Sequence, residues 1–256
     1  MIEIAVILAA GRGVRMGPAG REIPKGFITV GGQTLIGRSL AHLFAHGIAR
    51  VVIVTGHLRE RYERLAAQDP SRIACCHNAN YATLGSLESL RLGLVAIDGP
   101  ALVLESDIVY EDRMIEAMRA RGCRSALLVT DVTGSGDEVY VWSKPLPDGR
   151  HAVETVHKDR ARVSRAPLGE YPGVFALGAD ARQALLACAP GLLARSPMAD
   201  YEAGLMAVTR DVPIECFRMP DLVWAEVDDA RMLRRVEQSV YPRIAALASS
   251  RVAGVR

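Results

Sequence analysis

Short apolar runs alternate with amphipathic segments through the first half of the chain. Runs rich in branched residues at 4–8, 50–55, 72–77 and 101–107 have the length and composition of buried parallel strands. The segments between them space their apolar residues as helices do, and Thr34 is a suitable N-cap for the first helix. This rhythm predicts right-handed crossovers and a Rossmann-like α/β fold, with a mostly parallel sheet flanked by helices. Ligands of such sheets bind beyond the carboxyl ends of the strands.

The pattern changes after residue 131. Segments 138–142 and 152–156 alternate apolar and polar residues around a turn that contains Pro and Gly, which predicts an antiparallel hairpin and a mixed sheet. The other expected elements are strands at 125–130, 170–177 and 222–229, helices at 35–46, 59–67, 86–97, 112–122, 179–189, from 199 and at 231–248, and a basic tail from 249. We expect one domain over 1–256, with halves at 1–131 and 132–230 and a C-terminal helix and tail at 231–256.

Composition limits the class of protein. The chain has 256 residues, of which 50% are hydrophobic and 23% charged, which is enough for a large core. A net charge of +2 without a run of Lys or Arg argues against a nucleic-acid partner. Five cysteines without a Cys-x-x-Cys pair fit a reducing compartment, and the first apolar run is too short to span a membrane. We therefore expect a cytoplasmic protein with no membrane partner.

A glycine-rich basic loop follows the first expected strand. The sequence Leu8-Ala-Ala-Gly-Arg-Gly-Val-Arg-Met16 leads on to Pro24-Lys25. Glycines let backbone N–H groups approach phosphate oxygens, Arg offers a planar fork and Lys a mobile charge. The loop therefore favours polyphosphate binding, with a plain surface turn as the alternative. It fits neither a dinucleotide fold, whose third glycine is replaced by Met16, nor a P-loop, since no Gly-Lys-Ser/Thr follows.

This loop resembles the signature of the sugar-phosphate-type nucleotidyltransferases, which have the nucleotide-diphospho-sugar transferase type of fold. In that family the loop wraps a nucleoside triphosphate, and the residues that match Arg15 and Lys25 hold its phosphates. Ala9-Ala10 stand where guanylyl-transferring relatives tend to carry two glycines, which favours a pyrimidine nucleotide and leaves CTP, UTP or another NTP open. The resemblance implies a nucleotide site made of Leu8, Ala9, Ala10, Gly11, Gly13, Arg15, Lys25, Gly56, Asn78, Thr83 and Ser86.

A second informative stretch runs from 78 to 90. Polar residues end the preceding strand, and Gly85-Ser86 can cap a helix whose N-terminus suits an anion or a base edge. A routine capped loop explains the stretch equally well. It resembles the Asn-x-x-Tyr-x-x-x-Asn-Asn-x-x-Ser-Leu segment of bacterial choline-phosphate cytidylyltransferases, with Gly85-Ser86 in place of the Asn pair. The matching residues are Asn78, Tyr81, Ser89 and Leu90.

Acids at the ends of two distant strands favour a metal site. Asp107 ends the strand that begins at 101, where a carboxylate beside a triphosphate can hold Mg²⁺; a solvated strand-end Asp is the alternative. Glu226 and Asp228 share one face of the last expected strand, because the strand period is two. Asp228 or Asp229 also caps the next helix. The resemblance implies that Asp107, Glu226 and Asp228 are the protein ligands of Mg²⁺.

The resemblance also places an acceptor site in the second half. Lys158 matches a lysine that touches the acceptor phosphate, although a lone Lys after a strand is usually solvated. Tyr201 and Glu202 match an aromatic residue and an acid near the cationic end of the acceptor; an amphipathic helix surface is the alternative. Glu138 stands where the choline enzymes carry Trp. A carboxylate suits a primary ammonium, which donates hydrogen bonds, better than trimethylammonium, and favours an aminoalkyl acceptor.

Together these residues predict a nucleotidyl transfer. No Ser/His/Asp or Cys/His arrangement can be assigned, and an anionic acceptor needs no general base, only positioning and charge neutralisation. We expect a Mg²⁺-dependent cytidylyltransferase that transfers CMP from CTP to 2-aminoethylphosphonate or a phosphocholine-like acceptor and releases pyrophosphate. Its catalytic residues would be Arg15, Lys25, Asp107 and Lys158. A sugar-1-phosphate nucleotidyltransferase or a non-catalytic nucleotide-binding regulatory subunit are the alternatives, and a homo-oligomer is compatible with the sequence.

Overall fold

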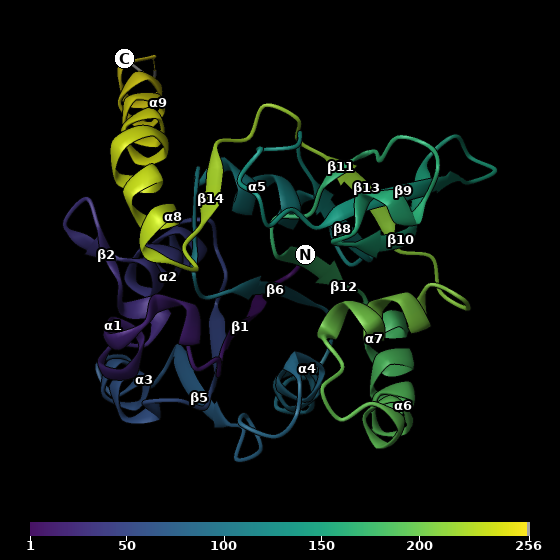
Figure 1. Ribbon diagram of the computed structural model, residues 1–256, viewed down its shortest axis with the longest axis horizontal. Coiled ribbons are helices and arrows are strands. Elements are labelled where there is room, and N and C mark those ends of the chain that lie inside the picture. Colours follow the sequence, from purple (N-terminus) through teal and green to yellow (C-terminus); the bar gives the residue numbers. More distant parts are fainter. Residues whose placement is uncertain (255–256) are drawn as a thin grey trace.

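A mixed sheet forms the centre of the molecule (Figure 1). The structure, a computed structural model, describes residues 1–254, with the side chains of 18–19 and 252–254 not among those described. Within these residues the sheet has ten strands, in the spatial order β11 (Gly169–Glu170), β9 (Tyr140–Pro145), β10 (His151–His157), β13 (Glu215–Arg218), β8 (Ala126–Val129), β12 (Val174–Leu177), β6 (Ala101–Glu105), β1 (Ile4–Ala9), β4 (Arg50–Thr55) and β5 (Ile73–His77).

The two halves of the sheet differ in strand direction. Strands β6, β1, β4 and β5 are parallel to one another, as the repeated strand–helix pattern predicted. Strand β12 runs antiparallel between β6 and β8, and β9 and β10 form the expected antiparallel hairpin. The predicted mixed α/β fold is confirmed.

Alternate residues of the central strands enter different cores, because a strand points successive side chains to opposite faces of its sheet. Val6 of β1 lies in one core, whereas Ala5 and Ile7 lie in the other. The core of Val6 is covered by α4 (Ser86–Val95), α6 (Ala179–Arg195) and α7 (Tyr201–Val208). The opposite core is covered by α2 (Leu35–Ala45), α3 (Arg59–Ala66) and α5 (Arg113–Ala120).

Helix α2 begins where the sequence signals place it, whereas α6 runs past its expected end. Thr34 caps α2 as predicted, since its Oγ1 accepts a hydrogen bond from Gly37 N at 3.1 Å. Helix α6 was expected to end at 189 but continues through Pro190 to Arg195. The lost backbone hydrogen bond is offset by burial, because Leu193 beyond the proline reaches the core.

Shorter elements complete the N-terminal half. The glycine-rich loop contains the 3₁₀ turn η1 (Val14–Met16), helix α1 (Pro18–Glu22) and the 3₁₀ turn η2 (Lys25–Phe27), and is followed by the ribbon of β2 (Thr29–Val30) and β3 (Gln33–Thr34). A further 3₁₀ turn, η3 (Arg160–Arg162), follows β10.

The last part of the chain returns to the N-terminal half (Figure 1). The strand expected at 222–229 is shorter, β14 (Trp224–Glu226), and pairs antiparallel with β7 (Ile108–Tyr110) in a separate two-stranded sheet. Beyond it, Val227 N donates to Asp107 O at 2.8 Å. This pairing carries the acids at 226 and 228 to Asp107.

The C-terminal segment is helical. It comprises α8 (Ala230–Arg235), the π-helical turn η4 (Val236–Val240) and α9 (Tyr241–Gly254), which extends away from the body of the molecule in Figure 1. Asp229 caps α8 as expected, since its Oδ1 accepts from Met232 N at 2.7 Å. The tail expected from 249 is therefore helical as far as Gly254, and 255–256 lie outside the described residues. None of the helices described here has the length and apolar character needed to cross a membrane.

Candidate active site

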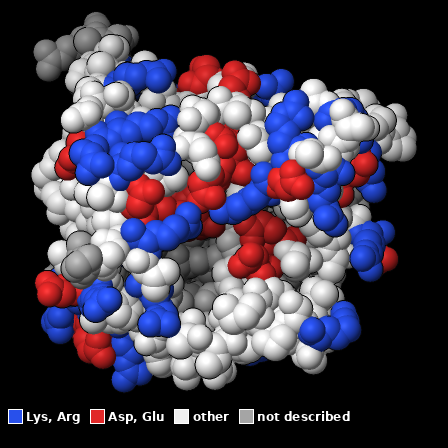
Figure 2. Space-filling view, in the orientation of Figure 1, with Lys and Arg blue, Asp and Glu red and all other residues white. Residues whose placement is uncertain are grey.

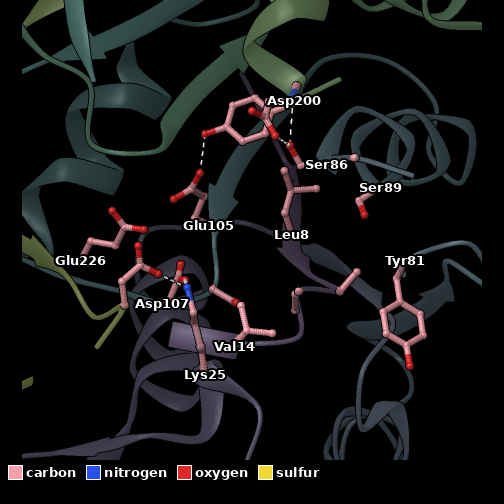
Figure 3. Close-up of a pocket in the computed structure, with 18 of the residues that line it drawn as sticks. Leu8, Val14, Lys25, Tyr81, Ser86, Ser89, Glu105, Asp107, Asp200 and Glu226 are labelled. Carbon is pink, nitrogen blue, oxygen red and sulfur yellow. Dashed lines mark hydrogen bonds and ion pairs between the residues drawn. The ribbon is translucent and has the colours of Figure 1, made fainter. Parts of the chain in front are cut away.

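A cavity of about 370 Å³ opens where β1 and β6 end (Figure 3). Its size is within the usual range for sites that bind small molecules. Most of the residues singled out from the sequence form its wall: Leu8, Ala9, Ala10, Gly11, Gly13, Arg15, Lys25, Ser86, Asp107, Lys158, Tyr201, Glu202, Glu226 and Asp228. The two halves of the chain therefore contribute to one cavity.

The glycine-rich loop needs two of its glycines to fold back towards the cavity. Gly13 has a φ of +59°, in the left-handed region, and its O accepts a hydrogen bond from Met16 N at 3.0 Å. A Cβ on Gly20 would lie 2.2 Å from Gly13 O, so a side chain there would push the two turns of the loop apart. The close packing of these turns places Lys25 beside Gly13, at the floor of the cavity.

Lys25 joins the acids that come from two distant parts of the chain. Its Nζ donates to Asp107 Oδ2 at 2.8 Å and also to Asp228 Oδ1, whose side chain is fully buried. Figure 3 shows Lys25, Asp107 and Glu226 directed toward the same point. Burial alone would lower the pKa of Lys25, but the charges of Asp107 and Asp228 outweigh it and raise the pKa above its ordinary value. The ammonium is therefore charged at any physiological pH.

The carboxylates at this point outnumber the cations beside them. Figure 2 shows acidic side chains gathered around the hollow near the centre of this face, with basic side chains next to them. Burial, and then the charges of neighbouring carboxylates, raise the pKa of both Glu105 and Glu226. Carboxylate oxygens of Glu105, Asp107 and Glu226 lie within 4.8 Å of one another. Hard oxygen donors with uncompensated negative charge are the set that Mg²⁺ prefers, so these residues fit that ion.

The opposite end of the cavity is formed by the start of α7. Tyr201 OH donates to Glu105 Oε1 at 2.5 Å, and Tyr201 N donates to Ser86 Oγ at 3.0 Å, which joins α7 to α4. Burial raises the pKa of Glu202 to about 7. Lys158 reaches the cavity from the end of β10, and its Nζ donates to Asp137 Oδ1 at 2.7 Å. The ammonium of Lys158 and the carboxyl group of Glu202 thus both line the cavity.

Four of the residues singled out from the sequence do not line the cavity: Gly56, Asn78, Thr83 and Glu138. Asn78 is fully buried, and its Nδ2 donates to Ser89 Oγ at 3.0 Å, which supports a residue of the wall. A Cβ on Gly56 would lie 2.7 Å from the side chain of Tyr81, so the glycine leaves room for this lining residue. The exposed Thr83 bonds within its own turn, and Glu138 Oε1 accepts from Gly136 N at 3.0 Å. The structure therefore brings none of the four into direct contact with the cavity.

Several polar residues at the cavity escaped the sequence analysis. Glu105 ends β6 two residues before Asp107, and the period of the strand expected at 101–107 would have placed both on one face. Tyr81 and Ser89, which match the cytidylyltransferase segment but were given no role in the site, line the cavity, as does Asp200. Asp137, which binds two of the lining cations, lies in a loop with no sequence signal of its own.

The chain is similar in sequence to two curated proteins. The chain is 35% identical over 125 residues to the CMP-5'-(3-aminopropyl)phosphonate synthase of Streptomyces rubellomurinus, a match that covers 48% of this chain and 20% of the relative. It is 29% identical over 138 residues to the 2-aminoethylphosphonate cytidylyltransferase of Lancefieldella rimae, covering 53% and 55%. These matches therefore span about a fifth and about half of the length of the two relatives.

Solved structures share the fold over nearly the whole chain. A CTP:phosphocholine cytidylyltransferase from Streptococcus pneumoniae superposes with a TM-score of 0.73 at 20% identity, covering 93% of this chain and 99% of that one. A UDP-glucose pyrophosphorylase in complex with UDP-glucose gives 0.75 at 16% identity, covering 95% and 100%. The family model of the MobA-like NTP transferase domain matches residues 5–188, and the chain therefore belongs to that family.

Proposed function

We propose that the chain is a Mg²⁺-dependent cytidylyltransferase that transfers CMP from CTP to a small phosphonate or phosphate acceptor and releases pyrophosphate. The observation that carries this proposal is the meeting of Lys25 with Asp107 and Asp228 in one cavity. Nucleotidyl transfer can use both kinds of group: a cation of a phosphate-binding loop to hold phosphates, and acids at the ends of two distant strands to hold a metal ion. The names of the two curated relatives support CTP as the donor and an aminoalkyl phosphonate as the acceptor.

The reaction needs positioned charges rather than a general base. An oxygen of the acceptor attacks the α-phosphorus of CTP, and the bond from this phosphorus to the oxygen that bridges to the β-phosphorus breaks. The electron pair leaves with pyrophosphate. A phosphate monoester has a second pKa of about 6, so the attacking oxygen is already anionic at neutral pH. Arg15 and Lys25 would hold the leaving pyrophosphate, and Lys158 would bring up the acceptor anion.

The metal belongs to the same proposal. Asp107, Glu226 and Asp228 would hold Mg²⁺, with Glu105 next to them. When bound, the ion supplies positive charge that reduces repulsion between the anionic acceptor and the α-phosphate. The NTP site would then belong to 1–131, apart from the acids at 226 and 228, and the acceptor site to 132–230.

The acceptor end of the cavity favours a primary amine over a quaternary ammonium. Glu202 offers a carboxylate that can accept hydrogen bonds from an ammonium group, which trimethylammonium cannot donate. The ring of Tyr201 is stacked on Phe175 at 5.7 Å and meets Tyr171 edge-on at 6.3 Å, so these neighbours limit its use in an aromatic cage. These contacts support 2-aminoethylphosphonate or a similar amine ahead of phosphocholine.

A pyrophosphate-release assay tests the proposal. Each of the four common NTPs is offered with Mg²⁺ and one of 2-aminoethylphosphonate, 3-aminopropylphosphonate, phosphoethanolamine, phosphocholine or glucose 1-phosphate. We expect release with CTP and an aminoalkyl acceptor, lowered by about 10²-fold or more in Lys25→Ala and in Asp107→Ala, with the exposed Lys144→Ala as the control. Release only with glucose 1-phosphate, or nucleotide binding without any release, would contradict the proposal in favour of a sugar-1-phosphate enzyme or a regulatory subunit.

A further inference from the structure

Asp137 binds two cations that come from different halves of the chain. Arg15 Nη1 of the glycine-rich loop donates to Asp137 Oδ2 at 2.5 Å, and Lys158 Nζ of the acceptor half donates to Oδ1 at 2.7 Å. The side chain of Asp137 is only 19% exposed, whereas those of Arg15 and Lys158 are 52% and 58% exposed. One largely buried carboxylate is therefore bound to two exposed cations of the kind that bind phosphate.

The loop that carries Asp137 is held in place from several sides. Glu170 Oε2 accepts from Thr133 N at 2.6 Å, and Arg231 donates to Ser135 O at 2.9 Å. Gly136 adopts a φ of +93° immediately before Asp137, a conformation that other residues rarely adopt. The carboxylate is thus presented to Arg15 and Lys158 by a defined loop between β8 and β9.

Every cation that lines the described cavity is already bound to a carboxylate. Lys25 binds Asp107 and Asp228, Arg15 binds Asp228 and Asp137, and Lys158 binds Asp137. A substrate phosphate competes with these carboxylates for the same cations. On the proposed function Asp107 and Asp228 then have a divalent ion to bind. Of these three carboxylates, only Asp137 is left without a partner in the proposed function once phosphates have taken its cations.

We propose that Asp137 is an internal competitor of the substrate phosphates for Arg15 and Lys158, and that it sets the selectivity of the cavity for polyanions. This inference rests on the proposed function, in which both cations bind phosphates. A weak single anion cannot displace a carboxylate that is already held at both donors, whereas a pyrophosphate group and an acceptor anion each replace one of its contacts. Removing the carboxylate therefore tightens the binding of phosphates.

A second reading of Asp137 leads to the opposite result. Its carboxylate lies within 4.8 Å of those of Glu226 and Asp228, a spacing at which three acids can share a cation. If Asp137 were a metal ligand, its loss would weaken the binding of nucleotide in the presence of Mg²⁺ and leave binding without Mg²⁺ unchanged.

Titration calorimetry on the full chain distinguishes the readings. Inorganic pyrophosphate and CTP are titrated into the wild type and Asp137→Asn, each in EDTA and in Mg²⁺. Asp131→Asn is the matched control, because Asp131 lies in the same loop, is 65% exposed and binds Arg218 at 2.8 Å away from the cavity. Partly exposed ion pairs contribute little each, so we expect Asp137→Asn to bind pyrophosphate about 3- to 10-fold more tightly in both buffers. The control should remain within about twofold of the wild type.

The other outcomes overturn the inference. Equal or weaker pyrophosphate binding by Asp137→Asn, with an unchanged thermal unfolding curve, shows that the carboxylate does not compete; weakening confined to Mg²⁺ identifies it as a metal ligand. If neither the wild type nor the variants bind pyrophosphate or CTP, the proposed function fails and the inference fails with it. If Asp137→Asn binds pyrophosphate more tightly but no acceptor yields product, only the proposed acceptor chemistry fails.

Discussion

Replacing Lys25 by Met removes the cation that holds the acids of the site together. The side chain of Lys25 is 17% exposed, and its ammonium binds Asp107 and the fully buried Asp228. Removing one partner of a buried ion pair costs roughly 3–5 kcal/mol, because the remaining charge stays buried without compensation. Arg15 still binds Asp228, so we expect a loss at or below the bottom of that range, about 2–3 kcal/mol. For a chain of this size the corresponding fall in Tm is about 4–12 °C.

The pH dependence of this loss has a definite sign. Because the pKa of Lys25 is raised in the folded state, its stabilisation is fully present below its ordinary value of 10.5 and falls only as the pH passes the raised value. In the variant the acids lose their neighbouring cation, so the cost of burying their negative charge is absent at low pH, where carboxyl groups are protonated, and grows as the pH rises. The difference in Tm between wild type and variant should therefore be largest near pH 7.5 and smallest near pH 4.5.

Thermal unfolding followed by circular dichroism, at both pH values and with or without Mg²⁺, measures the effect. Mg²⁺ should stabilise Lys25→Met more than the wild type, because it supplies the positive charge that the lysine provided. Lys144→Met is the matched control, since Lys144 is exposed on β9. A fall in Tm no greater than that of the control would refute the view that Lys25 compensates buried acids. A difference in Tm that is larger at pH 4.5 than at pH 7.5 would refute it as well.

Three further predictions concern the acceptor, the loop and the fold. Glu202→Gln should raise the KM for 2-aminoethylphosphonate about tenfold, because only the ionised Glu202 attracts an ammonium. For the same reason the wild-type KM should rise as the pH falls through about 7, the pKa of Glu202, and the variant should lack this part of the rise. Gly20→Ala should weaken CTP binding at least about tenfold in calorimetry, because its Cβ would meet Gly13 O at 2.2 Å and displace the loop. Asp229→Ala should lower the free energy of unfolding by about 1 kcal/mol in urea titrations, because the bond to Met232 N is lost.

Local patterns were enough to predict the fold. Apolar runs and helical spacing gave the parallel half of the sheet, and alternation gave the hairpin of β9 and β10. The failure at α6 has a physical reason: a proline normally ends a helix, but burial of Leu193 was not visible from local sequence. Tertiary packing overrode the local signal there.

The site was predicted less completely than the fold. Asp107, Glu226 and Asp228 do converge, but the strand expected to align the last two ends at Glu226. What brings them in is the bond from Val227 N to Asp107 O, a contact between segments more than a hundred residues apart. Asp137 could not be found at all, because its place depends on a loop shaped by distant residues and by Gly136.

The small ribbon of β7 and β14 has a consequence for the growing chain. Most of the sheet is made from residues that leave the ribosome before residue 218, yet two of the acids at the cavity arrive only with the strand that follows. An unfinished or clipped product can thus bury much of its apolar surface while lacking this half of the acid cluster. Whatever chemistry the cluster supports is therefore reserved for polypeptides synthesised past residue 228.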